Sequence, residues 1–430
     1  MSLPKRKVAP GVSLSMLATD KFKVNSLIMN IELPLTEENV TYANLCARVL
    51  KRGTKNYPDI KSLTIKLDEL YASDISAAVT RSGETEYLCL YSDFLVERYT
   101  GECDIIKEIT DLFGEMLFAP LAHNGEFNKD YVTVEKKNVS DSIDSLINNK
   151  SAYAKFRCTE EMCKGEVYAI SPLGNKEILS GITAKSLYEF YRNAVRENRI
   201  EFLYTGEAVY FDKIYDCLCE VFKNSDRCYT PYKSECYIKK SAENTREIIE
   251  DMPVNQGKLS IGMLTGITNT SDDIAPLIVA NEIFGGSPNS KLFMNVREKM
   301  SLCYYCSSGL DAVKGLMFVN AGIETENFDV AKEAIFKQLD AVKRGEFTDE
   351  EFDSAIASLV NGYKSVSDSV TSLEAWYMSR IFRDEDDTPE SRMEQVLKVT
   401  PEEVKAAAAK ISPEGVFFLR GTLKEDEADE

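Results

Sequence analysis

The feature that most constrains this chain is an internal repeat, because the same order of predicted elements occurs twice, offset by roughly half of its length. In the first half, apolar patterns predict paired strands at 75–80 and 86–95, followed by an amphipathic helix at 105–117. The corresponding elements of the second half are strands at 302–309 and 316–323 and a helix at 328–342. Strand pairs followed by helices, without strict alternation of the two, indicate an α+β fold.

The repeat divides the chain into two predicted domains. A polar stretch at 223–245, rich in Lys, Ser and Asn and containing Pro231, is predicted to link them. The predicted N-terminal domain is therefore 1–222, and the predicted C-terminal domain is 246–430. The alternative is two unrelated α+β domains that share common elements. The acidic segment 424–430 is predicted to be solvated and disordered.

The charge of the chain excludes one class of partner. Its 51 basic and 70 acidic side chains give a formal net charge of −19, so it repels phosphate backbones and is not expected to bind nucleic acid. No apolar run approaches the ~20 residues that a membrane helix needs, and the basic start of the chain leads into no apolar stretch. We therefore predict neither a membrane segment nor a secretory signal. A preference for basic peptides would suit the negative charge, but solubility is the simpler explanation.

Eleven cysteines, an odd number without regular spacing, favour a reducing compartment, and we predict a cytoplasmic protein. Cys303 and Cys306 are three residues apart on a predicted strand, which should point them to opposite faces of its sheet. Cys217 and Cys219 are two apart on a predicted helix and should also diverge. All eleven are therefore expected to be small buried hydrophobic residues rather than metal ligands or redox partners.

A helix is predicted at 37–52. Thr36 is a natural N-cap for it, and Gly53 follows its end as a helix-terminating glycine. Two acidic residues, Glu37 and Glu38, lie where the helix dipole favours negative charge.

The end of this helix, residues 50–54, resembles the end of the zinc-binding helix in the insulinase/pitrilysin family of metallopeptidases. Other stretches are also similar to that family. They are Thr80 and 85–87 in the first half, and 284–287, 291–293, 296–299 and 302–304 in the second. The resemblance covers essentially the whole chain, in the half-size format of bacterial members that work as two-chain clamshells. It implies two similar domains that form half of a clamshell, each an antiparallel sheet with helices packed on one face.

The catalytic motif of that family is missing. Active members carry an inverted His-x-x-Glu-His motif in this helix, and the matching positions here hold Asn44, Ala47 and Arg48. Asn44 and Arg48 share a helix face, but an amide is a poor zinc ligand and a guanidinium repels the ion. Ala47 stands where the carboxylate base should be. The one histidine, His123, is predicted to lie in a loop and cannot replace two ligands.

The third zinc ligand of the family is an acidic residue further along the chain. It would fall in a predicted helix at 128–146, where Glu135 is the nearest carboxylate. Alone, Glu135 is expected to be an ordinary glutamate on the helix surface. We therefore predict no metal on this chain and no peptide hydrolysis by the chain alone.

A second part of the family signature is retained. Arg297 and Tyr304 are seven residues apart, across a helix end and the start of a strand. The resemblance implies that the arginine anchors bound peptide and that the tyrosine hydroxyl donates to the oxyanion of the reaction, in a site whose metal is held by another chain. The plainer alternative is a surface arginine paired with Glu298 and a tyrosine that packs in the sheet.

The resemblance also implies that a peptide substrate adds as a strand to an exposed sheet edge, here the strand at 75–80. Thr80 lies on that strand. Active members have Asn-Ala where this chain has Ala77 and Ala78, so one side-chain contact to substrate is expected to be lost.

Two functions from different classes fit the sequence. The first is a non-catalytic subunit that pairs with a homologous zinc-bearing peptidase chain, binds peptide substrate and stabilises the transition state for it. The second is a proteolytically inactive peptide-binding or scaffold protein that self-associates. The retained pair, Arg297 and Tyr304, favours the first, because a pure scaffold has no need of it. An independent thiol enzyme lacks support, because no cysteine lies in a recognisable motif with a histidine.

Overall fold

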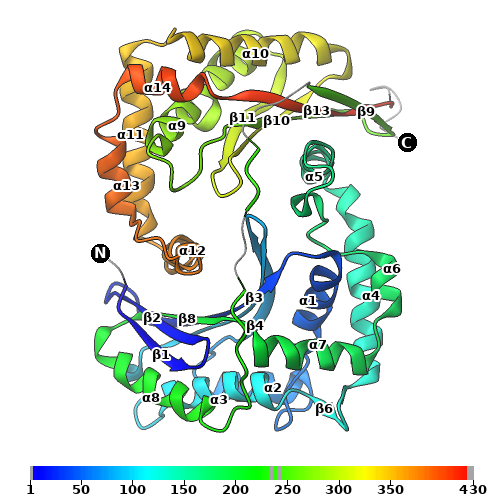
Figure 1. Ribbon diagram of the computed structural model, residues 1–430, viewed down its shortest axis with the longest axis vertical. Coiled ribbons are helices and arrows are strands. Elements are labelled where there is room, and N and C mark those ends of the chain that lie inside the picture. Colours follow the sequence, from blue (N-terminus) through cyan, green and yellow to red (C-terminus); the bar gives the residue numbers. More distant parts are fainter. Residues whose placement is uncertain (1–2, 233–235, 240–244, 424–430) are drawn as a thin grey trace. The chain divides into compact units, whose positions relative to one another are not determined.

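The computed structural model describes residues 3–232, 236–239 and 245–423 (Figure 1). These residues form two compact units. The first unit contains residues 3–144, 171–232 and 369–387, and the second contains 145–170, the residues described between 236 and 368, and 388–423. Part of the predicted linker and the whole predicted acidic tail lie outside the described residues.

The first unit is built on a six-stranded sheet with the order β1-β2-β8-β3-β5-β4. Its strands are β1 (Lys5–Ala9), β2 (Val12–Ala18), β3 (Val24–Pro34), β4 (Ser76–Ser82), β5 (Thr85–Leu95) and β8 (Ile200–Gly206). Neighbouring strands are antiparallel except β2 and β8, which are parallel. Because side chains alternate along a strand, β3 presents Leu27 and Met29 to the hydrophobic core and Ile28 to the opposite face of the sheet.

Helices cover the core side of this sheet. The helices of the first unit are α1 (Glu37–Leu50), α2 (Ile60–Glu69), α3 (Ile105–Phe118), α4 (Lys129–Ser145), α6 (Lys176–Gly181), α7 (Ala184–Glu197), α8 (Phe211–Phe222) and α12 (Val370–Ile381). The predicted cap of α1 is present, since the Thr36 side chain accepts a hydrogen bond from the Asn39 amide at 3.0 Å. One helix, α12, lies on the other side of the sheet from α3 and α8 (Figure 1).

The second unit is built on a five-stranded sheet with the order β11-β12-β10-β13-β9. Its strands are β9 (Arg246–Met252), β10 (Gly257–Leu264), β11 (Cys303–Asp311), β12 (Leu316–Ile323) and β13 (Ser412–Gly421). Its helices are α5 (Lys150–Met162), α9 (Ile274–Asn281), α10 (Phe328–Arg344), α11 (Asp349–Val366), α13 (Pro389–Val396) and α14 (Pro401–Ala408), with π-helical segments η5 (Glu282–Gly286) and η6 (Leu292–Lys299). Neighbouring strands are antiparallel except β13 and β9, which are parallel.

Short elements complete both units. They are the two-stranded ribbon of β6 (Ala122–His123) and β7 (Glu126–Phe127), and the 3₁₀ turns η1 (Glu97–Tyr99), η2 (Leu146–Asn148), η3 (Val167–Ala169), η4 (Ala208–Tyr210) and η7 (Thr325–Asn327). The one histidine, His123, belongs to this ribbon. Among the residues described, no helix combines the length and the apolar character needed to cross a membrane.

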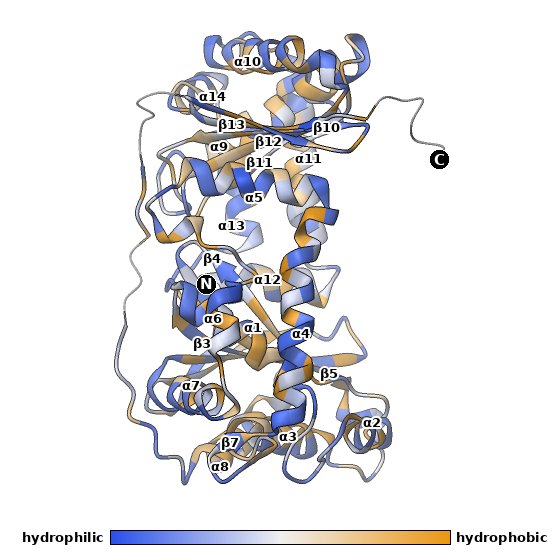
Figure 2. Ribbon diagram, turned by 90° about the vertical axis from the view of Figure 1, so that its right-hand side faces the viewer, coloured by the Kyte–Doolittle hydropathy of each residue, from blue (hydrophilic) through white to orange (hydrophobic). Residues whose placement is uncertain are grey.

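The predicted repeat and α+β class are confirmed. In the first sheet β3 lies between the β5–β4 pair and β8, and in the second sheet β10 lies between the β12–β11 pair and β13. Each sheet also contains one parallel pair, β2 with β8 and β9 with β13. The helices that cover the sheets are amphipathic, as the alternating blue and orange colouring of α10 shows (Figure 2).

The strands of the two sheets lie within the predicted domains 1–222 and 246–430, but two helices do not follow that division. Helix α5 belongs to the second unit, although it precedes the predicted linker, and α12 belongs to the first unit, although it follows the linker. Each of them packs on the side of a sheet that the other helices leave uncovered. This exchange was not predicted, because the local sequence of a helix does not specify the sheet on which the helix packs.

The cysteines depart from prediction at two points. Cys303 pairs with Ile323 across β11 and β12, but Tyr305 pairs with the next residue of β12, so Tyr304 is an extra, bulged residue. The bulge shifts the alternation of side chains, so Cys303 and Cys306 are both buried and their thiols share a hydrogen bond, which lowers the pKa of Cys303 and raises that of Cys306. The prediction that they face opposite sides was wrong. The prediction that every cysteine is buried was also wrong, because Cys228 is exposed.

Candidate functional site

The first part of the site is the face of α1 where zinc ligands were sought. The Asn44 amide nitrogen donates hydrogen bonds to the carbonyl oxygens of Val40, at 2.9 Å, and Pro172, at 3.0 Å. The first of these bonds lies within α1, and the second joins α1 to the segment before α6. The amide therefore serves a structural purpose at this position.

Arg48 lies one helical turn after Asn44 and reaches α4. Its guanidinium donates to the Ser142 hydroxyl at 2.8 Å, and that hydroxyl donates in turn to the Asn138 carbonyl at 2.8 Å. Ala47 is buried in the hydrophobic core at 4% exposure. This face of α1 thus offers a bound amide and a guanidinium, and it has no carboxylate that could act as a base.

Glu135 on α4 has a different place from the one predicted. It is 4% exposed, so the expectation of a surface glutamate was wrong. Arg52 donates to it through Nε at 2.6 Å, and the Asn138 amide donates at 3.0 Å. Arg52, four residues after Arg48, thereby neutralises the buried carboxylate of Glu135. The α4 residue that faces Arg48 is Ser142 and not Glu135.

The second part of the site is a hollow of about 430 Å³ in the second unit, lined by both Arg297 and Tyr304. Arg297 lies in the last turn of η6, with its guanidinium 4.4 Å from the centre of the Phe293 ring and 3.7 Å from the Glu298 carboxylate. Tyr304 is 57% exposed, and its hydroxyl donates to the Glu324 carboxylate. The two side chains therefore line one hollow, and the tyrosine does not pack in the sheet.

Three unusual backbone features hold these two side chains. Arg297 lies in a π-helical segment, a geometry that occurs frequently at functional sites. Ser301, between η6 and β11, has φ of +52°, which is uncommon for a residue with a side chain. Tyr304 is the bulged residue of β11, so the bulge turns its ring out of the normal alternation of the strand.

The third part is the outer strand of the first sheet. In the part of the chain that the structure describes, β4 pairs with β5 alone. Ala77 points into the core at 3% exposure, whereas Ala78 and Thr80 belong to the opposite face. The Thr80 hydroxyl lies 3.3 Å from the Cys89 sulfur on β5. The predicted substrate strand is therefore at a sheet edge, and α1 contacts it.

Comparison with known proteins identifies the family. A family model described as "Peptidase M16 inactive domain" matches residues 181–359. The chain is also 32% identical, over 413 residues, to the "Probable inactive metalloprotease YmfF" of Bacillus subtilis (strain 168), with 96% of each chain covered. The chain belongs to peptidase family M16, the insulinase/pitrilysin family.

Solved structures agree with this assignment. The M16 homologue superposes on a conserved protein from Enterococcus faecalis V583 with a TM-score of 0.91 and 25% identity, covering 99% of this chain and 100% of the other. It superposes on a peptidase M16 inactive domain from Pseudomonas fluorescens with a TM-score of 0.79 and 17% identity, covering 99% of each chain. The second likeness concerns the fold alone.

The residues of this M16 homologue do not fit the zinc ion that the family implies. An amide bound to two carbonyls, a guanidinium and a carboxylate paired with Arg52 provide no set of free ligands around one point. Within the described residues, no group of three His, Cys, Asp or Glu side chains could hold a metal ion. The chain is an M16 homologue of the inactive type.

Sequence reasoning missed one feature near β4. On the face of the first sheet opposite the core, α12 covers a cavity lined by Asn30 and Glu374. Asn30 lies on β3, and Glu374 lies more than three hundred residues further along the chain, so no local pattern joins them. The available signal was the polar residues of β3 on that face, because buried polar side chains of a central strand need hydrogen-bond partners from another element.

Proposed function

We propose that this chain is the non-catalytic subunit of a heterodimeric M16 peptidase, whose zinc is held by a homologous partner chain. In this role it binds extended peptide along β4, and it contributes Arg297 and Tyr304 to the site where the partner cleaves. The zinc of the partner supplies the hydrolytic chemistry. The observation that carries the proposal is the shared hollow of Arg297 and Tyr304, retained in a chain whose α1 lacks zinc ligands.

The surroundings of Arg297 support a role in binding. Its ion pair with Glu298 is long, at 3.7 Å, and both side chains are more than a third exposed, so the pair adds little to stability. Phe293 supports the guanidinium from one side. The other donors of Arg297 are therefore available to a peptide carbonyl or carboxylate.

The surroundings of Tyr304 support a role as a donor. Its hydroxyl donates to Glu324, which orients the phenol in the hollow. For the tyrosine to stabilise an oxyanion, its proton must turn from Glu324 to the substrate oxygen. A hydroxyl can make this exchange by rotation about its C–O bond, without movement of the backbone.

The binding of peptide along β4 rests on main-chain pairing. An extended chain that adds to an outer strand gains backbone hydrogen bonds whatever its side chains are. Because Ala77 and Ala78 carry no polar group, recognition on β4 itself should be tolerant of sequence. We place this heterodimer in the bacterial cytoplasm, which suits the eleven free cysteines.

The experiment is reconstitution with a zinc-motif homologue of similar size from the same cell. The pair should cleave a fluorogenic peptide, and Arg297→Ala should lower kcat/KM at least tenfold because it removes a charged contact to the peptide. The matched control is Arg344→Ala, since Arg344 is an exposed arginine of the same unit that pairs with Glu346. An unchanged kcat/KM for Arg297→Ala would contradict the role given to this residue.

The same preparation distinguishes the alternative function. A self-associating binding protein forms homo-oligomers and does not need a zinc-bearing chain. If sedimentation finds stable homodimers, and co-purification finds no zinc-motif homologue, the heterodimer proposal is wrong.

A further inference from the structure

The first unit contains a cavity of about 550 Å³ on the face of its sheet opposite the core. Strands β3, β4 and β5 form its floor, and α12 forms its roof. The volume is within the range of ordinary small-molecule sites, which is roughly 300–1,000 Å³. All of its lining residues belong to the first unit.

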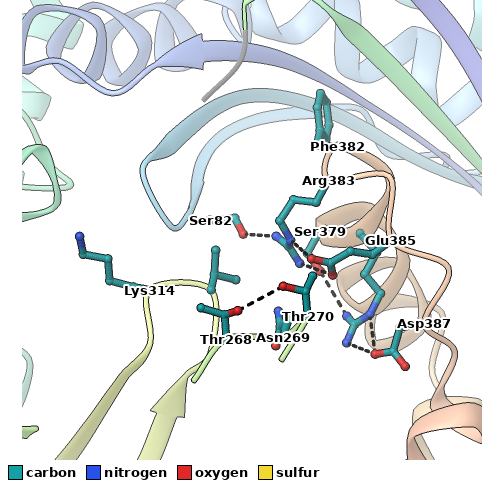
Figure 3. A network of polar contacts seen from close by, with 12 residues as sticks. Ser82, Thr268, Asn269, Thr270, Lys314, Ser379, Phe382, Arg383, Glu385 and Asp387 are labelled. Carbon is teal, nitrogen blue, oxygen red and sulfur yellow. Dashed lines mark hydrogen bonds and ion pairs between the residues drawn. The ribbon is translucent and has the colours of Figure 1, made fainter. Parts of the chain in front are cut away.

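The roof is held in place at the end of α12. Arg383, just past the helix, donates to the Ser82 hydroxyl at the end of β4 at 2.8 Å and also pairs with Glu385 (Figure 3). On the other side, the Arg199 guanidinium donates to the carbonyls of Ile381 and Phe382 at 3.0 Å, which satisfies groups that a helix end leaves free. The end of α12 is therefore fixed by hydrogen bonds to the end of β4 and to the residue just before β8.

Two acceptor atoms in the lining have no hydrogen-bond donor within the described part of the chain. They are Oε1 of Glu374, on α12, and Oδ1 of Asn30, on β3. Both residues are 6% exposed. Buried acceptors are nearly always paired, so these two atoms indicate a missing donor group.

Apolar and aromatic side chains form about half of the remaining lining, and polar side chains that include Arg81 and Asp93 form the rest. Ile28 and Tyr91 contribute from the sheet, Met378 contributes from α12, and Phe382 contributes from the residue that follows α12. The Phe382 ring lies 4.5 Å from the Tyr87 ring, so the two form one aromatic wall. Such walls suit an alkyl or aryl body, whereas the two acceptors suit a head group that only donates.

A charged donor suits the cavity better than a neutral one. Burial raises the pKa of Glu374 to about 7, because its carboxylate is poorly solvated. The Ser26 and Thr205 hydroxyls face this carboxylate and act to lower the pKa, and the nearby Asp93 acts to raise it, so burial remains the dominant cause. A cation beside the carboxylate would remove that penalty. An ammonium group has three donors and no acceptor, which matches two unpaired acceptors.

We propose that this cavity binds a primary amine carried on an apolar body, with the ammonium donating to Glu374 and Asn30. Two sources share this chemistry: a free alkyl or arylalkyl amine, and the N-terminal amino group of a peptide whose first side chain is apolar. The site shares no residue with the hollow of Arg297 and Tyr304, although Ala78 and Thr80 of the proposed peptide-binding strand β4 are among its lining residues.

The test is titration calorimetry of the full chain with n-hexylamine, 1-hexanol and hexanoate. Hexylamine should bind at one site per chain, at least tenfold more tightly than hexanol, and hexanoate should not bind. Glu374→Gln keeps the shape of the side chain and should weaken hexylamine at least tenfold, while the exposed control Glu69→Gln should leave it unchanged. Absence of hexylamine binding, or equal affinity of the wild type and Glu374→Gln, would overturn the proposal.

Two further arms complete the design. If Glu374→Gln does not fold by circular dichroism, Ala375→Leu replaces it, because Ala375 lines the cavity from an exposed position on α12 and a larger side chain should fill the space and weaken the amine. Phe-Ala-Ala amide with a free or an acetylated amino group then separates the two sources. Tighter binding of the free peptide than of hexylamine assigns the site to peptide N-termini, and the reverse assigns it to free amines.

Discussion

Two regions of this M16 homologue match parts of one family signature, and they differ in how far their side chains are bonded within the fold. On α1, the positions of the zinc motif are now used by the fold, since Asn44 bonds to Pro172 and Arg48 bonds to Ser142. In the hollow of the second unit, Arg297 is partly exposed beside Glu298, and Tyr304 is exposed with its hydroxyl bonded to Glu324. The difference is that the α1 side chains are bound within the fold, whereas those of the hollow are placed where the proposed function needs them, beside solvent.

The strongest way to break this comparison is to rebuild the ligands on α1. In Asn44→His/Arg48→His/Ser142→Glu, two imidazoles one turn apart on α1 and a carboxylate on the α4 residue that faces Arg48 should bind zinc. We expect about one zinc per chain by metal analysis after dialysis. The double variant without Ser142→Glu is the control and should retain much less. Stoichiometric zinc in the wild type would contradict our description of α1.

A second variant sharpens the comparison in the other region. In the reconstituted pair, Tyr304→Phe removes the hydroxyl and keeps the ring, and loss of one oxyanion donor should lower kcat about 100-fold with little change in KM. Asn44→Ala, on α1, should leave kcat within about twofold. Equal effects of these two variants would remove the distinction between the regions.

The buried ion pair behind α1 should matter for stability alone. Glu135→Ala leaves Arg52 without its main partner in a site where the carboxylate was 4% exposed, and we expect a loss of about 3 kcal/mol in the free energy of unfolding. Urea denaturation measures this loss. The double variant Arg52→Met/Glu135→Leu should recover most of it, and a failure to recover would show that the pair has a purpose beyond its own neutralisation.

The smallest expected effect concerns the pH dependence of stability. The pKa of Glu374 is raised to about 7, so the folded chain binds its proton more tightly than the unfolded chain does. This group therefore stabilises the fold less and less as the pH rises from about 4.5 to about 7. Relative to the wild type, Glu374→Gln should gain about 2 kcal/mol between pH 5 and pH 8 in urea denaturation. A difference that does not change with pH would mean that the carboxylate is well solvated.

Local patterns were sufficient for much of the fold. Thr36 and the acidic first turn placed the start of α1, and amphipathic spacing placed α3 and α10 within two residues at each end. Such inferences succeed because the atoms that decide them are neighbours in sequence. Arg297 and Tyr304 were singled out by the resemblance, and the structure brings both to one hollow.

The features that were missed depend on distant or irregular contacts. The pairing of Glu135, on α4, with Arg52, just after α1, joins residues 83 positions apart, and α12 comes from the far end of the chain. The bulge at Tyr304 adds one residue to the strand, so each later side chain points to the opposite face from the one that regular alternation predicts. Cys306 therefore lies on the same side as Cys303. Periodicity assumes regular strands, so it could not predict that reversal.

The central claim is that this chain assists hydrolysis and does not perform it. The most direct measurement is a titration of a zinc-bearing M16 homologue from the same cell with the purified chain, followed through cleavage of a fluorogenic peptide. We predict that turnover rises from near zero to a plateau at one chain of each kind, and that zinc-supplied samples of this chain alone cleave nothing. Chelator-sensitive cleavage by this chain alone, or a partner whose turnover is unaffected by it, would contradict the account.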